Sequence, residues 1–505
     1  MMRHWALHPY HAILRLRGRQ IRSVSLGQLY WAIVALLIGG AGLFIAASWH
    51  MYHFAAADLW QHLAALNAII ENPLHPSNPF VVSEQPSRLF GPYWMLVGGV
   101  SKIFGLTAPQ GFVLGSILNL VLLGVGIWIL GRAIHGGASG ALALLAALLG
   151  GWLLGPNFTG YHDPLTLLSS SGYPAVTAVA ACLIMWGLAV KHIRGEAAGF
   201  ALPIVVALAF ATHPLGTSVG VAGVGAIALF TPDRALARRI KLIGLLALGL
   251  LGSLAWPFFN PLQVIGTAGS ARWGVGIDFY HPLWIAASLF PAAIGIIGLV
   301  RREMRPFLML FAACATGFAL GATPLFVAGH RLLPFVALTL HIGLSFVLLD
   351  LFRARTRKAR VGQVLALYVV VIQLAWTAIK LDEMQAQGRR DGNLLAAATL
   401  LTQGAEGGFA GLSTAAFPIA ASGRRVLSTP FAEPLVADFE TRQAATEALF
   451  DPALDPAARA ALARRHGVRY LVVDVRYSPQ RLRDTLLAGA TGTTQRGALL
   501  RYQLY

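Results

Sequence analysis

Long apolar runs, separated by short clusters of basic residues, make up most of the first 380 residues of this 505-residue chain. A helix needs about 20 largely apolar residues to cross the hydrocarbon core of a bilayer. Eleven runs approach or reach that length, at residues 28–49, 111–131, 138–156, 173–190, 197–213, 215–230, 242–258, 282–300, 307–325, 331–351 and 361–379. Only 12% of the residues are charged, against roughly a quarter in soluble domains, so an ordinary soluble enzyme is excluded. The sequence predicts a polytopic α-helical membrane protein.

The basic residues predict which loops face the cytoplasm, because cytoplasmic loops collect Lys and Arg. The test case is the short apolar stretch 88–104. If this stretch does not cross and the N-terminus is cytoplasmic, 20 of the 25 basic residues in 1–380 lie inside. If it does cross, every later loop changes side and most basic residues lie outside. We therefore expect about eleven spans in the inner (plasma) membrane, with 88–104 as an interfacial or re-entrant helix on the outer face.

The formal net charge of +18 raises the question of a nucleic-acid partner. The basic residues, however, are divided among separate loops between the apolar runs, so no single face of the protein collects them. Residues 381–505 hold 14 Arg and 12 acidic residues, which leaves a surplus of only +2. We expect no nucleic-acid partner, and we interpret most of the basic residues as markers of membrane topology.

The character of the chain changes after residue 380, which predicts two domains, 1–380 in the membrane and 381–505 outside it. A linker is expected at 381–393. The remainder alternates short β-like runs with helical ones, and these predict helices at 456–466 and 478–488 and strands at 468–474 and 498–504. The first of these helices has Asp455 as its expected N-cap. An odd number of spans places this small α/β domain on the extracytoplasmic side.

Two carboxylates stand out on the expected outer face, each close to a histidine. Asp58 begins a predicted amphipathic surface helix that also carries His62, and Asp163 follows His162 directly. Either carboxylate alone could be a helix cap, and either histidine could be a hydrogen-bonded loop residue. Together they could accept a proton from an attacking hydroxyl or amine. Asp58, Asp163 and His162 could also hold a divalent cation such as Mg²⁺ or Mn²⁺.

Arg331 lies at the outer end of an apolar run, directly after His330. An arginine there either extends its guanidinium to the lipid headgroups or has an anionic partner. The second interpretation suits a phosphate at the membrane surface, because Arg offers two parallel hydrogen bonds to it. Arg272 occupies another expected outer loop and could complete such a site.

This order of motifs resembles the GT-C superfamily of integral-membrane glycosyltransferases, which includes the protein O-mannosyltransferases and the lipid A aminoarabinose transferase. The matching elements are Asp58–Leu63 (DLWQHL), Gly91–Trp94 (GPYW), Tyr161–Leu165 (YHDPL), His330–Pro334 (HRLLP) and the C-terminal extracytoplasmic domain. Each motif is short, and their order and shared membrane side carry the resemblance.

The resemblance implies transfer of a sugar from a polyprenyl-phosphate donor, which enters from the membrane lipid, to an acceptor on the outer face. That acceptor would be a cell-envelope glycan, a lipid or a protein. Asp58 corresponds to the catalytic acid and Asp163 to a second acid that assists metal or acceptor binding. Arg331 corresponds to the basic residue at the donor phosphate, and the other expected substrate-binding residues are His330, His62, His162, Tyr93 and Arg272. Asp58 lacks the adjacent second acid of many relatives, so metal dependence is left open.

Two other classes of function remain as alternatives. A transporter or flippase would be expected to carry ionisable residues in the middle of its spans and an inverted repeat, neither of which is evident in the sequence. A non-catalytic scaffold for envelope polysaccharide assembly would have no need of the outer acids.

Overall fold

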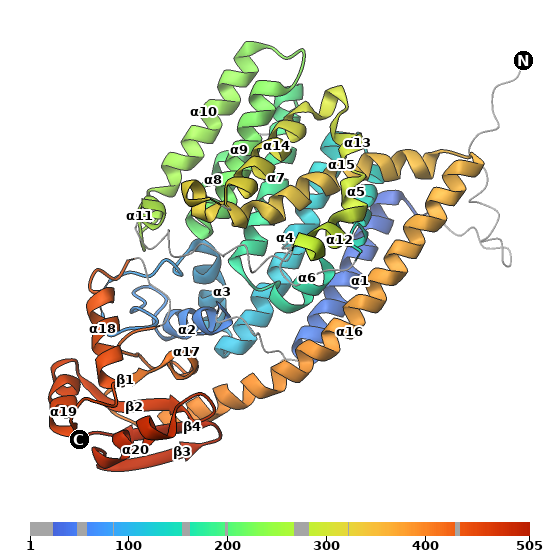
Figure 1. Cartoon of the computed structure of the whole chain (residues 1–505). Helices are drawn as coiled ribbons and strands as arrows, with labels where there is room; N and C mark the ends of the chain where they lie inside the picture. Colours follow the sequence, from blue (N-terminus) through green and yellow to red (C-terminus); the bar gives the residue numbers. More distant parts are fainter. Residues whose placement is uncertain are drawn as a thin grey trace, which may run out of the picture.

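The protein is almost entirely helical, with one small sheet near the C-terminus (Figure 1). A computed structural model describes residues 24–47, 58–83, 85–153, 162–196, 200–266, 282–321, 323–429 and 435–505. The helical bundle and the C-terminal α/β region lie at opposite ends of the molecule, joined by the long helix α16 (Arg357–Thr402) (Figure 1).

Six helices in the described residues are long and apolar enough to cross a membrane. They are α1 (Leu26–Ala47), α4 (Ala108–His135), α7 (Pro174–Arg194), α14 (Arg305–Leu320) together with the preceding 3-10 helix η4 (Arg302–Met304), α15 (Leu333–Arg353) and α16. The bundle also contains the shorter helices α5 (Ala138–Gly150), α8 (Ala201–Thr212), α9 (Pro214–Phe230), α10 (Leu236–Ser253), α12 (Pro282–Ala293) and α13 (Ile296–Leu299). Every expected span overlaps one of these helices, while the number that cross the bilayer stays a prediction.

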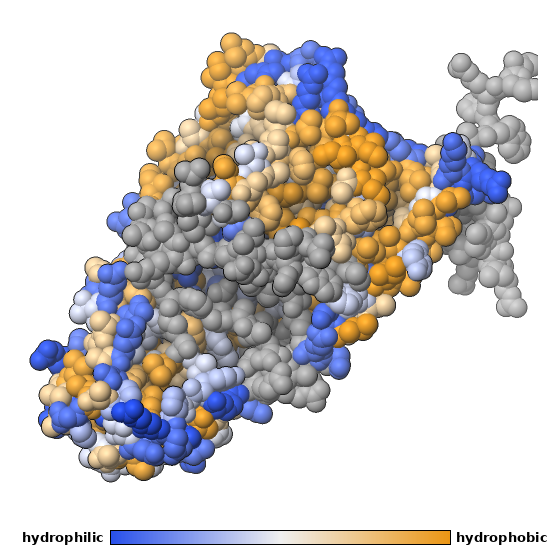
Figure 2. Space-filling view, viewed as in Figure 1, coloured by the Kyte–Doolittle hydropathy of each residue, from blue (hydrophilic) through white to orange (hydrophobic). Residues whose placement is uncertain are grey.

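The outer surface of the bundle is apolar. Large side chains such as Leu248 on α10 and Leu367 on α16 are 52% and 64% exposed. Figure 2 shows a broad hydrophobic surface over the bundle, with hydrophilic residues at its upper end and over the C-terminal region. An apolar surface of this extent is unfavourable in water and matches the hydrocarbon of a bilayer.

Small residues let the helices of the bundle approach closely. A Cβ on Gly126 of α4 would lie 2.8 Å from the carbonyl oxygen of Ala180, and one on Gly187 of α7 would lie 2.9 Å from the backbone nitrogen of Leu130. Both approaches are shorter than real Cβ contacts. Because lipid tails are as apolar as the side chains, van der Waals packing of this kind has a large part in holding membrane helices together.

The basic loops meet at one end of the bundle. Arg302 donates to Asp233 at 2.6 Å, and Arg301 pairs with Asp350. Arg194, from a third basic loop, donates to the carbonyl of Ala133. The sequence assigned these loops to one side of the membrane, and the packing brings them together.

The opposite end contains three short helices, α2 (Asp58–Glu71), α3 (Pro92–Ile103) and α6 (Pro164–Ser170). Helix α3 covers the ambiguous stretch 88–104 and has only 12 residues, too few to span the hydrocarbon core. Trp256, at the end of α10, donates to the carbonyl of Phe90 at 2.9 Å. These contacts hold the short helices against the ends of the longer ones.

The C-terminal sheet has the strand order β1-β2-β4-β3, with β1 and β2 parallel and the other pairs antiparallel. Its elements are β1 (Gly408–Gly411), α17 (Ser413–Ala421), α18 (Phe439–Leu449), α19 (Pro456–Arg465), β2 (Val468–Asp474), α20 (Gln480–Ala488), β3 (Gly492–Arg496) and β4 (Leu499–Gln503). All four predicted elements are present, and Asp455 caps α19 by accepting from Ala457 at 2.8 Å. The sequence did not predict β1, β3, α17 or α18.

The expected linker at 381–393 is wrong. Helix α16 continues through it without a break to Thr402. No proline or glycine cluster interrupts this segment, so nothing in the local chemistry ends the helix.

The C-terminal region is built onto the segment that follows α2. Val426 pairs with both Phe409 of β1 and Val81, so residues 80–82 extend the edge of the sheet. The Val426 N–H donates to the Phe80 carbonyl at 2.7 Å. Asn67 of α2 donates to the carbonyl of Ala421, also at 2.7 Å. Helix α2 therefore has the bundle on one side and the C-terminal region on the other.

The close approach of α4 and α7 predicts that Gly126→Ala destabilises the protein by about 1–3 kcal/mol, because the added methyl group meets a backbone carbonyl that cannot move away. The matched control is Gly225→Ala in α9, where a Cβ would meet nothing within 4 Å. Thermal unfolding in detergent should show a lower Tm for Gly126→Ala and an unchanged or slightly higher Tm for Gly225→Ala. Equal Tm values for the two variants would contradict the packing argument.

Candidate functional site

His62 lies on the buried face of α2, among aromatic rings. Its Nδ1 accepts a hydrogen bond from Trp94 Nε1 at 3.0 Å, and its ring centroid is 4.8 Å from that of Tyr173. Because Nδ1 is an acceptor, the neutral ring carries its proton on Nε2. Burial lowers the pKa of His62 to about 3, with Arg88 and His213 contributing in the same direction.

His213 stands in the turn between α8 and α9, at the same end of the bundle. Its Nδ1 accepts from the backbone N–H of Gly216 at 3.0 Å, so its proton is also on Nε2. Burial, together with charge repulsion from Arg331 and Arg88, lowers the pKa of His213 to about 4. Both histidines are therefore neutral near pH 7, and each offers one N–H donor.

Arg88 and Arg331 provide the positive charge around these histidines. Arg88 lies in the segment just before α3, where its Nη2 donates to Gln61 Oε1 of α2 at 3.0 Å. Arg331 lies in the 3-10 helix η5 (Pro324–Leu332), directly before α15, and is half-buried. Since their charges act on the same histidine, four segments far apart in sequence meet here. We call Arg88, Arg331, His62 and His213 the basic cluster.

His330 precedes Arg331 but belongs to the packing between η5 and α14. It is 4% exposed, and its ring centroid lies 5.7 Å from that of Phe318. Its neighbour Gly329 approaches α14 so closely that a Cβ there would lie 2.1 Å from the carbonyl of Gly317. This tight contact holds the end of η5, and with it the backbone of Arg331, against the bundle.

Asp163 is the N-cap of α6, one of the two roles that its local sequence allowed. It is also buried, which helix capping by itself does not require. Its Oδ1 accepts from the Thr166 N–H at 2.9 Å at the start of α6. Its Oδ2 is buried and has no hydrogen-bond partner within the described residues. The carboxyl is only 3% exposed, and burial raises its pKa to about 6. A carboxylate of this kind is able to take up a proton near neutral pH.

His162 points away from solvent into a second aromatic group. Its Nε2 lies 3.3 Å from Nδ1 of His341 in α15, and its ring centroid lies 5.2 Å from that of Trp152. His162 is fully buried, and burial lowers its pKa well below its usual range. His162 thereby connects the start of α6 to the middle of α15.

The remaining predicted site residues have different outcomes. Asp58 is the first residue of α2, one turn before His62, and nothing is described of its side chain. The Tyr93 hydroxyl donates to the Gly172 carbonyl at 2.7 Å and accepts from Asn119 at 3.0 Å, so it holds α3 in place. Arg272 lies outside the described residues. Within the described residues, no group of three or more His, Cys, Asp or Glu side chains could hold a metal ion.

Sequence reasoning missed Arg88 and His213 as members of the site. Their signals were weak: Arg88 precedes the interfacial Gly91–Trp94 motif by three residues, and His213 stands before a proline that divides two apolar runs. Only the packing of four separate segments shows that they join Arg331.

No protein-family model and no curated protein matches this sequence. Several solved structures match its fold along most of its length. ArnT from Cupriavidus metallidurans, bound to undecaprenyl phosphate, is 14% identical with a TM-score of 0.57, over 93% of this chain and 98% of that one. The Archaeoglobus fulgidus oligosaccharyltransferase in its apo form is 13% identical with a TM-score of 0.53, over 91% and 71%.

The mycobacterial arabinofuranosyltransferase AftD is 17% identical with a TM-score of 0.58, over 94% of this chain. This chain spans only 40% of the length of AftD. At such identities the likeness is one of fold. The chain therefore has the fold of the GT-C membrane glycosyltransferases, in agreement with the resemblance seen in its sequence motifs.

Proposed function

We propose that the protein is a membrane glycosyltransferase that moves a sugar from a polyprenyl-phosphate donor to an acceptor on the outer face of the membrane. The observation that carries the proposal is the basic cluster, two arginines and two neutral histidines placed together at one end of a bundle with the GT-C fold. The N-terminus would be cytoplasmic, and the C-terminal region and the cluster would be extracytoplasmic.

The cluster suits a lipid phosphate for two reasons. Arg88 and Arg331 supply charge and charge-assisted hydrogen bonds, which are stronger than neutral ones. His62 and His213 add neutral N–H donors, so the site binds an anion without four mutually repelling cations. Groups of this kind stabilise the phosphate as it leaves the sugar. The structures of ArnT with undecaprenyl phosphate and of AglB with dolichol-phosphate (TM-score 0.52, 12% identical) show that proteins of this fold bind such lipids.

Asp58 and Asp163 would act on the acceptor. In this proposal Asp58 takes the proton from the attacking group, and Asp163 orients that group in its ionised form. A divalent cation such as Mg²⁺ or Mn²⁺, where bound, would take ligands from Asp58, Asp163 and His162. The buried, unpartnered Oδ2 of Asp163 fits that role. The cation would supply charge stabilisation close to the acceptor.

The most direct test is mass spectrometry of lipids that co-purify with the protein. We expect a polyprenyl phosphate, and the presence of bulk phospholipid alone would contradict the proposal.

In the same preparations Asp58→Asn should abolish sugar transfer while donor-lipid binding and expression stay at wild-type levels. Undiminished transfer by this variant would refute the role of Asp58.

Removal of either arginine of the cluster should weaken donor binding. We expect Arg331→Ala and Arg88→Ala to reduce affinity for undecaprenyl phosphate roughly 10- to 100-fold, since a hydrogen bond to a charged group contributes about 1.5–3 kcal/mol. Native mass spectrometry or quenching of tryptophan fluorescence would measure the affinity. Arg302→Ala, at the opposite end of the bundle, is the control. Unchanged affinity in Arg331→Ala would assign its guanidinium to the lipid headgroups.

The raised pKa of Asp163 predicts a pH dependence of sugar transfer. The ionised carboxylate is the active form, so the rate should rise with pH and level off above an apparent pKa of about 6. The effect on stability has the opposite sign. The raised folded-state pKa stabilises the protein below the unfolded pKa of 3.8, and this stabilisation is lost as pH rises through about 6. Asp163→Asn should therefore gain Tm relative to wild type as pH rises from about 4 to about 6, as thermal unfolding would show. A flat rate profile with a constant Tm difference would contradict both expectations.

A further inference from the structure

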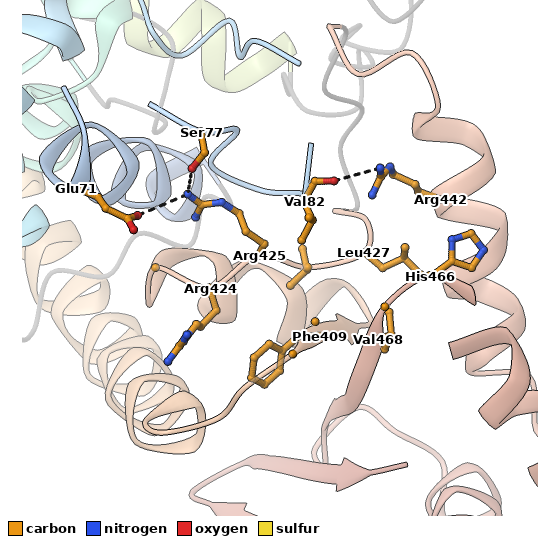
Figure 3. A pocket seen from close by; sticks show the side chains of 15 residues that line it. Glu71, Ser77, Val82, Phe409, Arg424, Arg425, Leu427, Arg442, His466 and Val468 are labelled. Carbon is orange, nitrogen blue, oxygen red and sulfur yellow. Dashed lines mark hydrogen bonds and ion pairs between the residues drawn. The ribbon is translucent and has the colours of Figure 1, made fainter. Parts of the chain in front are cut away.

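A cavity of about 530 Å³ lies between the C-terminal region and the segment that follows α2, away from the basic cluster (Figure 3). Six parts of the chain line it: the end of α2, the segment with Ser77 and Val82, residues 407–409, residues 423–427, α18, and residues 466–468. Its volume is in the range of small-molecule binding sites, about 300–1,000 Å³. The mechanism proposed above makes no use of it.

The charged residues that line the cavity are mostly basic. They are Arg424, Arg425, Arg442 and His466, against the single acid Glu71. Arg442 is neutralised by Asp438, to which its Nε donates at 2.8 Å. With this pair set aside, two arginines of the lining, Arg424 and Arg425, face one acid, Glu71.

Arg425 is the charge with the least compensation. Its side chain is only 16% exposed, and burial lowers the pKa of its guanidinium. The nearest carboxylate oxygen, on Glu71, is 3.9 Å away, and the Glu71 side chain is 74% exposed. The Ser77 hydroxyl accepts from Arg425 at 2.7 Å but carries no charge. A largely covered cation whose ion-pair partner is long and mostly exposed to solvent favours a closer anion.

Arg442 provides a second guanidinium group in the lining of the cavity. Figure 3 shows Arg425 directed toward Ser77 and Glu71, and Arg442 directed toward Val82. Arg442 donates to the Val82 carbonyl at 3.2 Å, and the Val82 side chain is 67% exposed. The segment 77–82, which extends the C-terminal sheet, is therefore held by an arginine at each of its ends.

Between these charged groups, the cavity is lined by glycines and by apolar side chains. Gly407, Gly423 and Gly467 have φ values of 109°, 87° and 65°, where a side chain would be strained. Val426, Leu427 and Val468 add small apolar surfaces beside exposed backbone. Polar groups around a modest apolar surface suit a sugar ring, which has hydroxyl groups at its edge and C–H groups on its faces.

We infer that this cavity binds an acidic saccharide unit, a sugar that carries a carboxylate or a phosphate, with Arg425 as the principal partner of the anion. The elements that line it lie beyond α2 from the bundle, on the hydrophilic part of the molecule (Figures 1 and 2), so a soluble glycan reaches it more readily than a lipid headgroup. The identification of this saccharide as part of the acceptor rests on the proposed function, whereas the binding itself does not.

The structure assigns Glu71 a competing role, because its carboxylate pairs with the same guanidinium, that of Arg425, that would bind the ligand anion. Its carboxylate occupies the side of Arg425 that a ligand anion would approach, and as an exposed side chain it can move aside. Removal of this carboxylate should therefore tighten the binding of an acidic ligand. A gain of affinity cannot result from damaged folding, which makes Glu71→Gln the sharpest variant for the test.

The experiment measures equilibrium binding of digalacturonate and glucose 6-phosphate to the full-length protein in nanodiscs of neutral phospholipid. Neutral digalactose is the uncharged probe. We expect the acidic probes to bind, roughly tenfold more weakly in Arg425→Gln and about threefold more tightly in Glu71→Gln. Affinity should fall as salt concentration rises. Arg481→Gln, an exposed arginine of α20 outside the cavity, is the matched control and should bind as wild type does.

Several results would overturn the inference. The first is an affinity for digalactose equal to that for the acidic probes. The second is an affinity for the acidic probes that is unchanged in Arg425→Gln or in Glu71→Gln. The third is tighter binding of a triglutamate peptide than of either acidic sugar. Competition by anionic phospholipid in the nanodisc would assign the cavity to a lipid headgroup instead. Binding of undecaprenyl phosphate is measured in parallel and should be unaltered in both variants. If the wild-type protein binds undecaprenyl phosphate but no acidic saccharide, this inference fails while the proposed function stands. If it binds an acidic saccharide but no undecaprenyl phosphate, the proposed function fails while the saccharide site stands.

Discussion

The hydrocarbon of a bilayer cannot satisfy backbone or side-chain polar groups, and the arrangement of this protein follows from that constraint. The described spans are therefore helices with apolar outer surfaces, and their contacts rely on small residues such as Gly126 and Gly187. Among the residues that the structure describes, most charged side chains of the bundle lie at its two ends. At one end, acids such as Asp233 and Asp350 neutralise the basic loops. At the other end, the half-buried Arg88 and Arg331 lie near the neutral histidines His62 and His213, which is where we propose that the donor phosphate binds.

Helix α2 connects the two halves of the molecule. One of its faces contributes His62 and Gln61 to the surroundings of Arg88, while Asn67 bonds to the end of α17 and the segment after α2 extends the C-terminal sheet. The proposed donor site and the inferred saccharide cavity are thus built on opposite ends of one 14-residue helix. This arrangement would place the inferred saccharide cavity and the proposed donor site at a set separation without a flexible linker, since α16 also continues unbroken into the C-terminal region.

Local patterns predicted the helices well because apolar length and capping chemistry act over short distances. The positions of all expected spans, the short helix at 92–103 and the Asp455 cap are present in the structure. The expected linker failed for a related reason: a polar composition reduces hydrophobicity but does not end a helix. Strands β1 and β3 were missed because each has only four or five residues, and each is stabilised by partners distant in sequence rather than by its own pattern.

The sequence by itself determined the membrane class, the grouping of basic loops and the candidate carboxylates Asp58 and Asp163, because hydropathy, charge distribution and motif order are properties of the linear chain. It also predicted that Arg331, at the outer end of an apolar run, contacts either lipid headgroups or an anion. Only the tertiary structure decided that Arg88 and His213 join Arg331 and His62, that Tyr93 is used in packing, and that a basic cavity forms beside Arg425. These features depend on contacts between segments that are distant in sequence, such as Tyr93 with Gly172 at 79 residues and Arg425 with Ser77 at 348 residues. Electrostatic coupling and burial arise only when such segments meet.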